Sequence, residues 1–166
     1  MLREAAALLL IAAVASASYP KKTVLFQDPA DYAGEMKCCM GAFNTPHNYT
    51  GAYQVNALYL SSHVRNYDTL EIGPEQQNIR ITMSETPYGV SDWKVVATAT
   101  YSEVAEPLQL LRVPISYKTD PSKYYLFEIS YGGSYTYPTY SSIDISAGPY
   151  KTSYNAFILG IDYEKA

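Results

Sequence analysis

Short runs in which apolar and polar residues alternate are the feature that most constrains how this chain folds. In Asn78–Ser84, the side chains of Ile79, Ile81 and Met83 share one face of an extended chain, with polar residues between them. A period of two residues is that of a β-strand with one buried face. Runs of this kind recur at residues 69–72, 93–100, 108–117, 124–131, 143–145 and 157–161. We therefore expect a chain built from strands.

The runs follow one another about every ten to fifteen residues, separated by turn sequences such as Gly-Pro, Asp-Pro-Ser and Gly-Gly, which is typical of a β-sandwich or jelly roll. Beyond the N-terminus no segment shows a helical period. The sequence predicts an all-β fold: a two-sheet antiparallel β-sandwich, jelly-roll-like, as a single domain over residues 18–166. Residues 51–166 form its body, and residues 18–50 a loop-rich lead-in. Pro114 indicates that its strand is an edge strand or carries a bulge.

The N-terminus has the pattern of a secretory signal peptide. Arg3 gives a charged start, residues 5–13 are apolar without interruption, and Ala15 and Ala17 form an A-x-A cleavage site. We expect residues 1–17 to be removed and the protein to be secreted. The apolar run is shorter than the ~20 residues that span a bilayer, and no later segment approaches that length. We therefore expect no membrane span.

Composition narrows the range of partners. The net charge at pH 7 is −4, and no cluster of Lys or Arg offers the basic surface that nucleic acids bind. Tyrosine is strongly over-represented, with 18 Tyr against 4 Phe and 1 Trp. Its ring favours strands, and its polar tip tolerates water, so it suits both packing and recognition. We expect no nucleic-acid partner.

Three tyrosines gather in one short segment between two strand-like runs: Tyr135, Tyr137 and Tyr140. A Gly-Gly pair precedes them and Pro138 lies among them, which favours a surface loop. On this interpretation the three rings form a platform that binds a glycan or a protein. Two alternatives stay open: the rings pack on the core, or they serve in covalent cross-linking.

Cys38 and Cys39 are adjacent and are the only cysteines in the chain. Neighbouring Cα atoms lie ~3.8 Å apart, below the ~4.4–6.8 Å that is usual for a disulfide, so a bridge between them would be strained. Two free thiols and an intermolecular disulfide both stay open. A covalent or non-covalent homo-oligomer is therefore among the expected assemblies.

Catalytic and metal-binding motifs are scarce. The chain has only two histidines, His47 and His63, which lie in no nucleophile motif and do not have the spacing of a His/Cys metal site. Glu71, Glu128 and Asp144 could converge as the carboxylates of a glycoside hydrolase, although solvated strand faces explain them more simply. We predict that the protein is not an enzyme.

Asn48 begins the triplet Asn-Tyr-Thr, which is an acceptor sequence for N-glycosylation. Because the N-terminus predicts passage through the secretory pathway, we expect a glycan at Asn48. A glycan would place this part of the chain on the surface.

The order of the strand-like runs carries a resemblance. Leu58-Tyr59-Leu60 is followed by Thr69-Leu70-Glu71-Ile72 and by Trp93-Lys94-Val95, then by Tyr125–Ile129 with its Phe-Glu pair, and then by Ser142–Ser146. From residue 58 to residue 150 this order resembles the second half of the MAM domain, an extracellular jelly-roll module. The cysteines depart from the family, because MAM domains carry four in two bridges and this chain has one adjacent pair.

The resemblance implies adhesion or recognition outside cells rather than catalysis. It also implies that a calcium site of oxygen ligands could include Asp144 and Glu128. We expect no other cofactor.

These observations together predict a secreted, non-catalytic recognition or adhesion module that binds a glycan or an extracellular protein. One alternative is a structural protein of an extracellular matrix, such as a cuticle, eggshell or adhesive, cross-linked through Tyr and Cys. A second alternative is a hydrolase built on a jelly roll.

Overall fold

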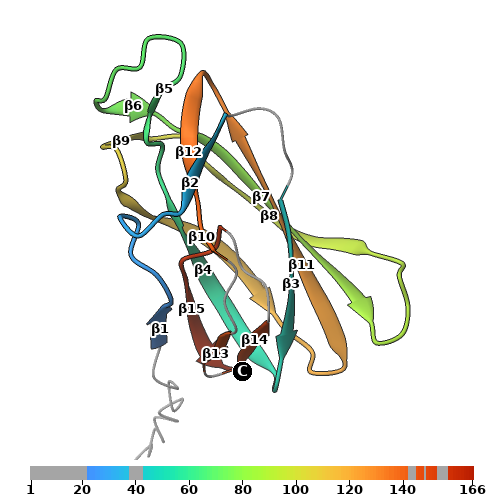
Figure 1. The fold of residues 1–166 in the computed structure, drawn as a ribbon. Helices are drawn as coiled ribbons and strands as arrows, with labels where there is room; N and C mark the ends of the chain where they lie inside the picture. Colours follow the sequence, from blue (N-terminus) through green and yellow to red (C-terminus); the bar gives the residue numbers. More distant parts are fainter. Residues whose placement is uncertain (1–21, 38–42, 142–144, 148, 153–156) are drawn as a thin grey trace, which may run out of the picture.

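The computed structural model describes residues 22–37, 43–141, 145–147, 149–152 and 157–166 (Figure 1). Within these residues every regular element is a strand. In chain order the strands are β1 (Lys22–Leu25), β2 (Gly34–Lys37), β3 (Phe43–Tyr49), β4 (Tyr53–Ser61), β5 (Arg65–Asn66), β6 (Glu75–Gln76), β7 (Asn78–Pro87), β8 (Lys94–Tyr101), β9 (Val104–Ala105), β10 (Leu110–Lys118), β11 (Lys123–Gly132), β12 (Tyr135–Thr139), β13 (Ile145–Ala147), β14 (Tyr150–Thr152) and β15 (Gly160–Lys165).

The strands form two large and two small sheets, and the strand pairs are antiparallel. The six-stranded sheet has the order β13-β14-β3-β11-β7-β8, and the four-stranded sheet has the order β1-β15-β4-β10. The small sheets are β2-β12-β5 and β6-β9. One cluster of buried apolar side chains draws members from both large sheets. The all-β prediction is therefore confirmed, and the arrangement is consistent with a β-sandwich.

The alternating runs predict the central strands correctly. On β7 the side chains of Ile79, Ile81 and Met83 are buried, and β11 buries every second residue from Tyr125 to Tyr131. β11 pairs with β7 over its whole length and with β3 on its other side. The inward side chains of β11 are buried, and removing apolar surface from water stabilises the fold.

Pro114 lies where the sequence predicts, in an edge strand that carries an irregularity. β10 ends the four-stranded sheet, and its pairing with β4 shifts register between Pro114 and Tyr117. A proline has no N–H to donate, so it is tolerated where one side of the strand has no partner.

Two predictions about local structure are wrong. Residues 28–50 were expected to be loop-rich, but they contain β2 and β3, and β3 lies inside the six-stranded sheet between β14 and β11. Residues 69–72 were expected to form a strand, but they lie in the loop between β5 and β6. Leu70 there adopts the left-handed conformation, with a φ of 61°.

Candidate binding surface

The predicted tyrosine platform does not lie in a surface loop. Tyr135, Tyr137 and Tyr140 lie in or just after β12, which is held between β2 and β5. Tyr137 is 0% exposed and Tyr140 is 6% exposed, whereas Tyr135 is half-buried. The prediction of an exposed loop is therefore wrong. The segment is a strand that pairs with β2, which is distant in sequence, and the local sequence does not indicate this pairing.

Each of the three rings has a structural contact. The ring of Tyr137 packs on Tyr131 with centroids 4.1 Å apart, and the hydroxyl of Tyr140 donates to the backbone oxygen of Pro29 at 3.0 Å. Tyr135 donates to Glu75 at 3.1 Å. Burial raises the pKa of Tyr140 to about 12. These contacts hold the small sheet together, so Tyr137 and Tyr140 are not offered to a ligand.

Four large apolar side chains that reach solvent belong to the β7–β8 hairpin. Tyr88, Val90, Trp93 and Val95 are between 38% and 55% exposed. We call these four residues the hairpin surface. They include the only tryptophan of the chain. Trp and Tyr are the residues most often responsible for binding energy at protein interfaces.

Backbone and side-chain hydrogen bonds fix the turn that carries the hairpin surface. The N–H of Val90 donates to the oxygen of Pro87 at 3.2 Å, and the hydroxyl of Thr86 donates to the oxygen of Val90 at 3.0 Å. Gly89 sits between them with a φ of 77°, a conformation that L-residues rarely adopt. The exposed side chains are therefore presented on an ordered turn.

Tyr88 also ties the hairpin to the neighbouring β10–β11 turn. Its ring lies against Tyr124 with centroids 4.3 Å apart, and its hydroxyl donates to the oxygen of Pro121 at 2.8 Å. Its N–H donates to the oxygen of Ser122 at 3.4 Å. The two turns therefore form one end of the molecule, seen at the lower right of Figure 1.

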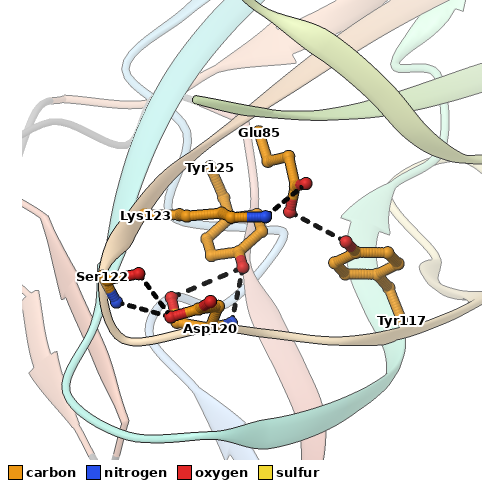
Figure 2. Close-up of polar contacts among 6 residues, drawn as sticks. All are labelled: Glu85, Tyr117, Asp120, Ser122, Lys123 and Tyr125. Carbon is orange, nitrogen blue, oxygen red and sulfur yellow. Dashed lines mark hydrogen bonds and ion pairs between the residues drawn. The ribbon is translucent and has the colours of Figure 1, made fainter. Parts of the chain in front are cut away.

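The β10–β11 turn is closed by polar contacts, which Figure 2 shows. The backbone N–H of Asp120 donates to the hydroxyl oxygen of Tyr125 at 2.6 Å. Asp120 Oδ1 accepts from the N–H of Ser122 at 2.8 Å and from its hydroxyl at 2.6 Å. These two hydrogen bonds hold the pKa of Asp120 below its usual value. A tyrosine that bonds the backbone a few residues upstream is the arrangement known as a tyrosine corner in β-sandwiches.

Glu85 joins this turn to β7. Its carboxylate accepts from Lys123 Nζ at 2.7 Å and from the Tyr117 hydroxyl at 2.8 Å (Figure 2). Partial burial acts to raise the pKa of Glu85, but the hydrogen bonds from Lys123 and Tyr117 outweigh it and leave the pKa below its usual value. Burial, together with the same carboxylate, raises the pKa of Tyr117. Both groups keep their usual charge at neutral pH.

A shallow pocket of about 360 Å³ opens beside the turn. We call it the turn pocket, and it is lined by Ala52, Tyr117, Lys118, Thr119, Asp120, Pro121 and Lys123. Because Pro121 also receives the hydrogen bond from Tyr88, the pocket adjoins the hairpin surface. Aromatic faces, lysine donors and a carboxylate are thus available within one end of the fold. Such a surface can stack on a sugar ring or pack on a protein.

Of the predicted calcium and disulfide residues, the structure describes Glu128. Glu128 is half-buried in the middle of β11, opposite Thr82 of β7, while Asp144, Cys38 and Cys39 lie outside the described residues. Among the residues that the structure describes, no three His, Cys, Asp or Glu side chains form a group that could hold a metal ion.

Asn48 lies on β3 rather than in a loop, but its side chain is exposed. Its Cα partners in the sheet are Tyr124 on one side and Lys151 on the other. The acceptor side chain is therefore accessible, next to the ring that supports Tyr88.

Both histidines are fully buried. His63 follows β4, and both of its ring nitrogens are hydrogen-bonded. The ring of His47 lies in the core against Phe127 and Tyr150, at centroid distances of 4.8 and 4.4 Å. Burial lowers the pKa of His47 well below its usual value. Neither imidazole faces a ligand.

Sequence reasoning placed Trp93 and Val95 in one strand, and β8 does contain Val95 but begins at Lys94, one residue after Trp93. It missed the hairpin surface because both side chains are exposed. The signal was present in the turn sequence Thr-Pro-Tyr-Gly, which places Tyr88 in a turn. Three more large apolar residues follow within that hairpin. Apolar side chains in a turn cannot all reach the core, so their spacing predicts exposure.

Comparison with known protein families finds no match for this chain. Comparison with curated proteins finds no similar sequence. The resemblance to the MAM domain therefore stays a prediction. In the part of the chain that the structure covers, no helix is long and apolar enough to cross a membrane.

Proposed function

We propose that this protein is a secreted, non-catalytic recognition module that binds a glycan or an extracellular protein through the hairpin surface. The observation that carries the proposal is the exposure of Tyr88, Val90 and Trp93 in the β7–β8 connection and of Val95 at the start of β8, where hydrogen bonds hold the backbone of residues 86–90. Large apolar side chains grouped on an ordered element mark interaction sites more often than scattered ones do.

The physical gain on binding follows from this order. A rigid turn loses little conformational entropy when a partner covers it, so more of the energy of burial appears as affinity. Trp93 and Tyr88 provide ring faces for a sugar or for an apolar patch. Lys123 and Asp120, in the adjoining turn pocket, provide a donor and an acceptor that can orient the ligand.

Several finer features belong to the same proposal. The N-terminal pattern supports secretion, and the order of strand-like runs supports a jelly-roll module of the MAM type with an adhesive role. The glycan acceptor at Asn48 supports an extracellular setting, since its side chain is exposed.

The test compares two variants with matched loss of exposed apolar surface. Trp93→Ala combined with Val90→Ala removes half of the hairpin surface, and Leu70→Ala combined with Ile72→Ala removes two exposed residues at the other end of the molecule. Surface changes usually alter stability within about 0.5 kcal/mol each, so both variants should fold. Binding is measured on a glycan array and on a panel of purified secreted proteins.

We expect the hairpin variant to lose binding and the Leu70/Ile72 variant to keep it, with melting temperatures close to that of the parent protein. Binding that survives in the hairpin variant would contradict the proposal. So would a parent protein that binds no glycan and no protein above background.

One contact favours a second candidate function, a matrix protein cross-linked through tyrosine. The rings of Tyr88 and Tyr124 lie 4.3 Å apart, and Tyr88 is 47% exposed. Two phenol rings in contact near solvent could be joined by an oxidant. Dityrosine fluorescence in the natural material, lost in Tyr88→Phe, is the expected sign of this role. Natural material without that fluorescence would exclude it.

A further inference from the structure

The loop between β5 and β6 presents two large apolar side chains to solvent. Leu70 is 66% exposed and Ile72 is 71% exposed, the two highest values among the exposed large apolar residues of the described chain. Leu70 also holds the left-handed backbone conformation, which is unfavourable for a residue other than glycine. We call residues 67–74 the tip loop. It stands at the top of Figure 1.

The tip loop is held in this conformation by its own hydrogen bonds. Asn66 Oδ1 accepts from the N–H groups of Asp68 and Thr69, at 2.9 and 3.2 Å. The Asn66 backbone accepts from the N–H of Leu70 and donates to the oxygen of Glu71, both at 2.8 Å. The exposure of Leu70 is therefore fixed by the local structure.

A buried histidine anchors the far end of the loop. His63 Nε2 donates to the oxygen of Gly73 at 2.8 Å, and Gln77 Nε2 donates to His63 Nδ1 at 2.7 Å. His63 and Gln77 are both 0% exposed. Because a carbonyl oxygen can only accept, these contacts assign a neutral ring with its proton on Nε2. The loop is thus tied to the body of the fold at Asn66 and at Gly73.

The tip end of the molecule is acidic. The ion pair between Arg65 and Glu35 is neutral, and Lys37 lies with its Nζ 5.3 Å from the centroid of the Tyr67 ring. Arg80, exposed near the start of β7, is a further cation toward this end. Five carboxylates outside the ion pairs of the described residues lie in or next to the tip loop and β9: Asp68, Glu71, Glu75, Glu103 and Glu106. Exposed apolar side chains rimmed by negative charge fit a partner surface with a pocket rimmed by positive charge.

The opposite end of the same molecule offers such a surface. The turn pocket holds about 360 Å³ and has Lys118 and Lys123 in its wall. Lys123 is paired with Glu85, and Asp120 adds one carboxylate to the wall, so Lys118 is the lysine of the wall without an ion pair among the described residues. The positive charge of Lys94 helps to lower the pKa of Glu85, and Glu85 also forms an ion pair with Lys123. Lys94 therefore adds a third amino group close to the pocket. Lys94 and Lys118 are exposed and take part in none of the ion pairs found among the described residues.

We propose that the tip loop of one copy docks into the turn pocket of a second copy. Leu70 and Ile72 enter the pocket beside Tyr117, while Asp68 and Glu71 meet Lys118 and the neighbouring lysines. The two surfaces lie at opposite ends of the fold (Figure 1), so one contact cannot close on itself and each added copy exposes a new tip. The assembly is a head-to-tail chain. It does not require a ligand on the hairpin surface.

Sedimentation velocity on the purified protein over a range of concentrations tests this inference through two charge-reversal variants. The tip variant carries Asp68→Lys and Glu71→Lys, and the base variant carries Lys94→Glu and Lys118→Glu. We expect the parent protein to form open-ended oligomers that weaken as salt rises. Each variant alone should remain a monomer, with its association constant lowered at least about tenfold. Circular dichroism confirms that both variants are folded.

Mixing the two variants gives the decisive measurement. A lysine-bearing tip then meets a glutamate-bearing pocket, and the unchanged tip of the other copy meets an unchanged pocket, so chains of alternating copies should form. A parent protein that stays monomeric at high concentration would overturn the inference, and so would variants that fail to associate when mixed. Trp93→Ala should assemble like the parent protein, which separates self-association from ligand binding at the hairpin surface.

Discussion

The hydroxyl oxygen of Tyr125 lies 2.6 Å from the backbone nitrogen of Asp120 (Figure 2). Asp120 is the second residue after the end of β10. This hydrogen bond joins the start of β11 to the turn that precedes it. It therefore fixes where β11 enters the sheet. The hairpin surface and the turn pocket both depend on that entry point, because Tyr88 bonds the same turn through Pro121.

Tyr125→Phe is expected to destabilise the fold by about 1–3 kcal/mol, since the N–H of Asp120 loses its acceptor in a partly buried place. Chemical denaturation measures the change. Tyr124→Phe is the matched control, because it removes a hydroxyl from the next residue on the opposite face of β11, where a change should cost within about 0.5 kcal/mol. Equal effects from the two substitutions would show that the turn does not depend on the Tyr125 hydroxyl.

Tyr137 provides a test of the corrected position of the tyrosines. Its ring is buried, and its hydroxyl has no hydrogen-bond partner among the described residues. Tyr137→Phe removes a buried hydroxyl that makes no hydrogen bond with the described residues, so the free energy of unfolding should stay equal or rise by up to ~1 kcal/mol. Tyr137→Ala should cost ~3–5 kcal/mol because it leaves a cavity against Tyr131.

The same denaturation measurement on Tyr140→Phe serves as the control. The Tyr140 hydroxyl donates to Pro29, so its removal should cost about 0.5–1.5 kcal/mol. If Tyr137→Ala lowered the free energy of unfolding by less than ~0.5 kcal/mol, the result would support the exposed loop that the sequence predicts over the buried strand.

The central strands could be predicted from the sequence because their neighbours reinforce a local pattern. β11 alternates from Tyr125 to Tyr131, and β7 alternates as far as Met83, where its pairing with β8 shifts register. Each of the two strands has a partner on both sides. β3 could not be predicted in this way. It contains Pro46 and His47 and has weak strand propensity. Its pairing with β11 and β14, both distant in sequence, makes it a strand.

The candidate site shows the same limit of local reasoning. Glu71 and Ile72 continue an alternation that resembles a strand, but Asn66 draws the chain into a closed loop and leaves both side chains exposed. Tyr137 lies in a segment whose proline makes it resemble a loop, but the segment pairs with β2 as a strand. Exposure of a given ring depends on which distant segment lies over it, and the alternation of neighbouring residues carries no such information.

Secretion and glycosylation give a prediction that rests on two short motifs. The secreted protein should begin near Ser18 and carry one N-glycan at Asn48, whose side chain is exposed on β3. Mass spectrometry before and after glycosidase treatment measures both features. Asn48→Gln is expected to shift the mass to that of the deglycosylated parent. A secreted product that retains Met1, or that has the same mass after glycosidase treatment, would contradict the corresponding half of this prediction.

His47 should make the stability of the fold depend on pH just below neutrality. Its ring is fully buried among aromatic side chains, and its Nδ1 has no partner within the described residues. Burial lowers the pKa of His47 in the folded state, whereas an unfolded chain keeps a value near 6.5. Below about pH 6.5 the unfolded chain therefore binds a proton that the folded protein does not.

The contribution of His47 to the free energy of unfolding should consequently be constant above about pH 7.5 and fall as pH drops below about 6.5, by up to ~1.4 kcal/mol per pH unit until the folded-state pKa is reached. Urea denaturation at pH 7.5, 6.5, 5.5 and 5.0 measures the slope, and His47→Phe is the comparison, because Phe fills the space without titrating. His63 is present in both proteins, so the difference between the two curves isolates His47. Glu85 and Asp120 have pKa values below their usual range, so the stability that their charged forms contribute is lost only at a lower pH than the range that the urea denaturation covers. Parallel curves for the parent protein and His47→Phe between pH 6.5 and 5.0 would show that His47 does not couple folding to protonation.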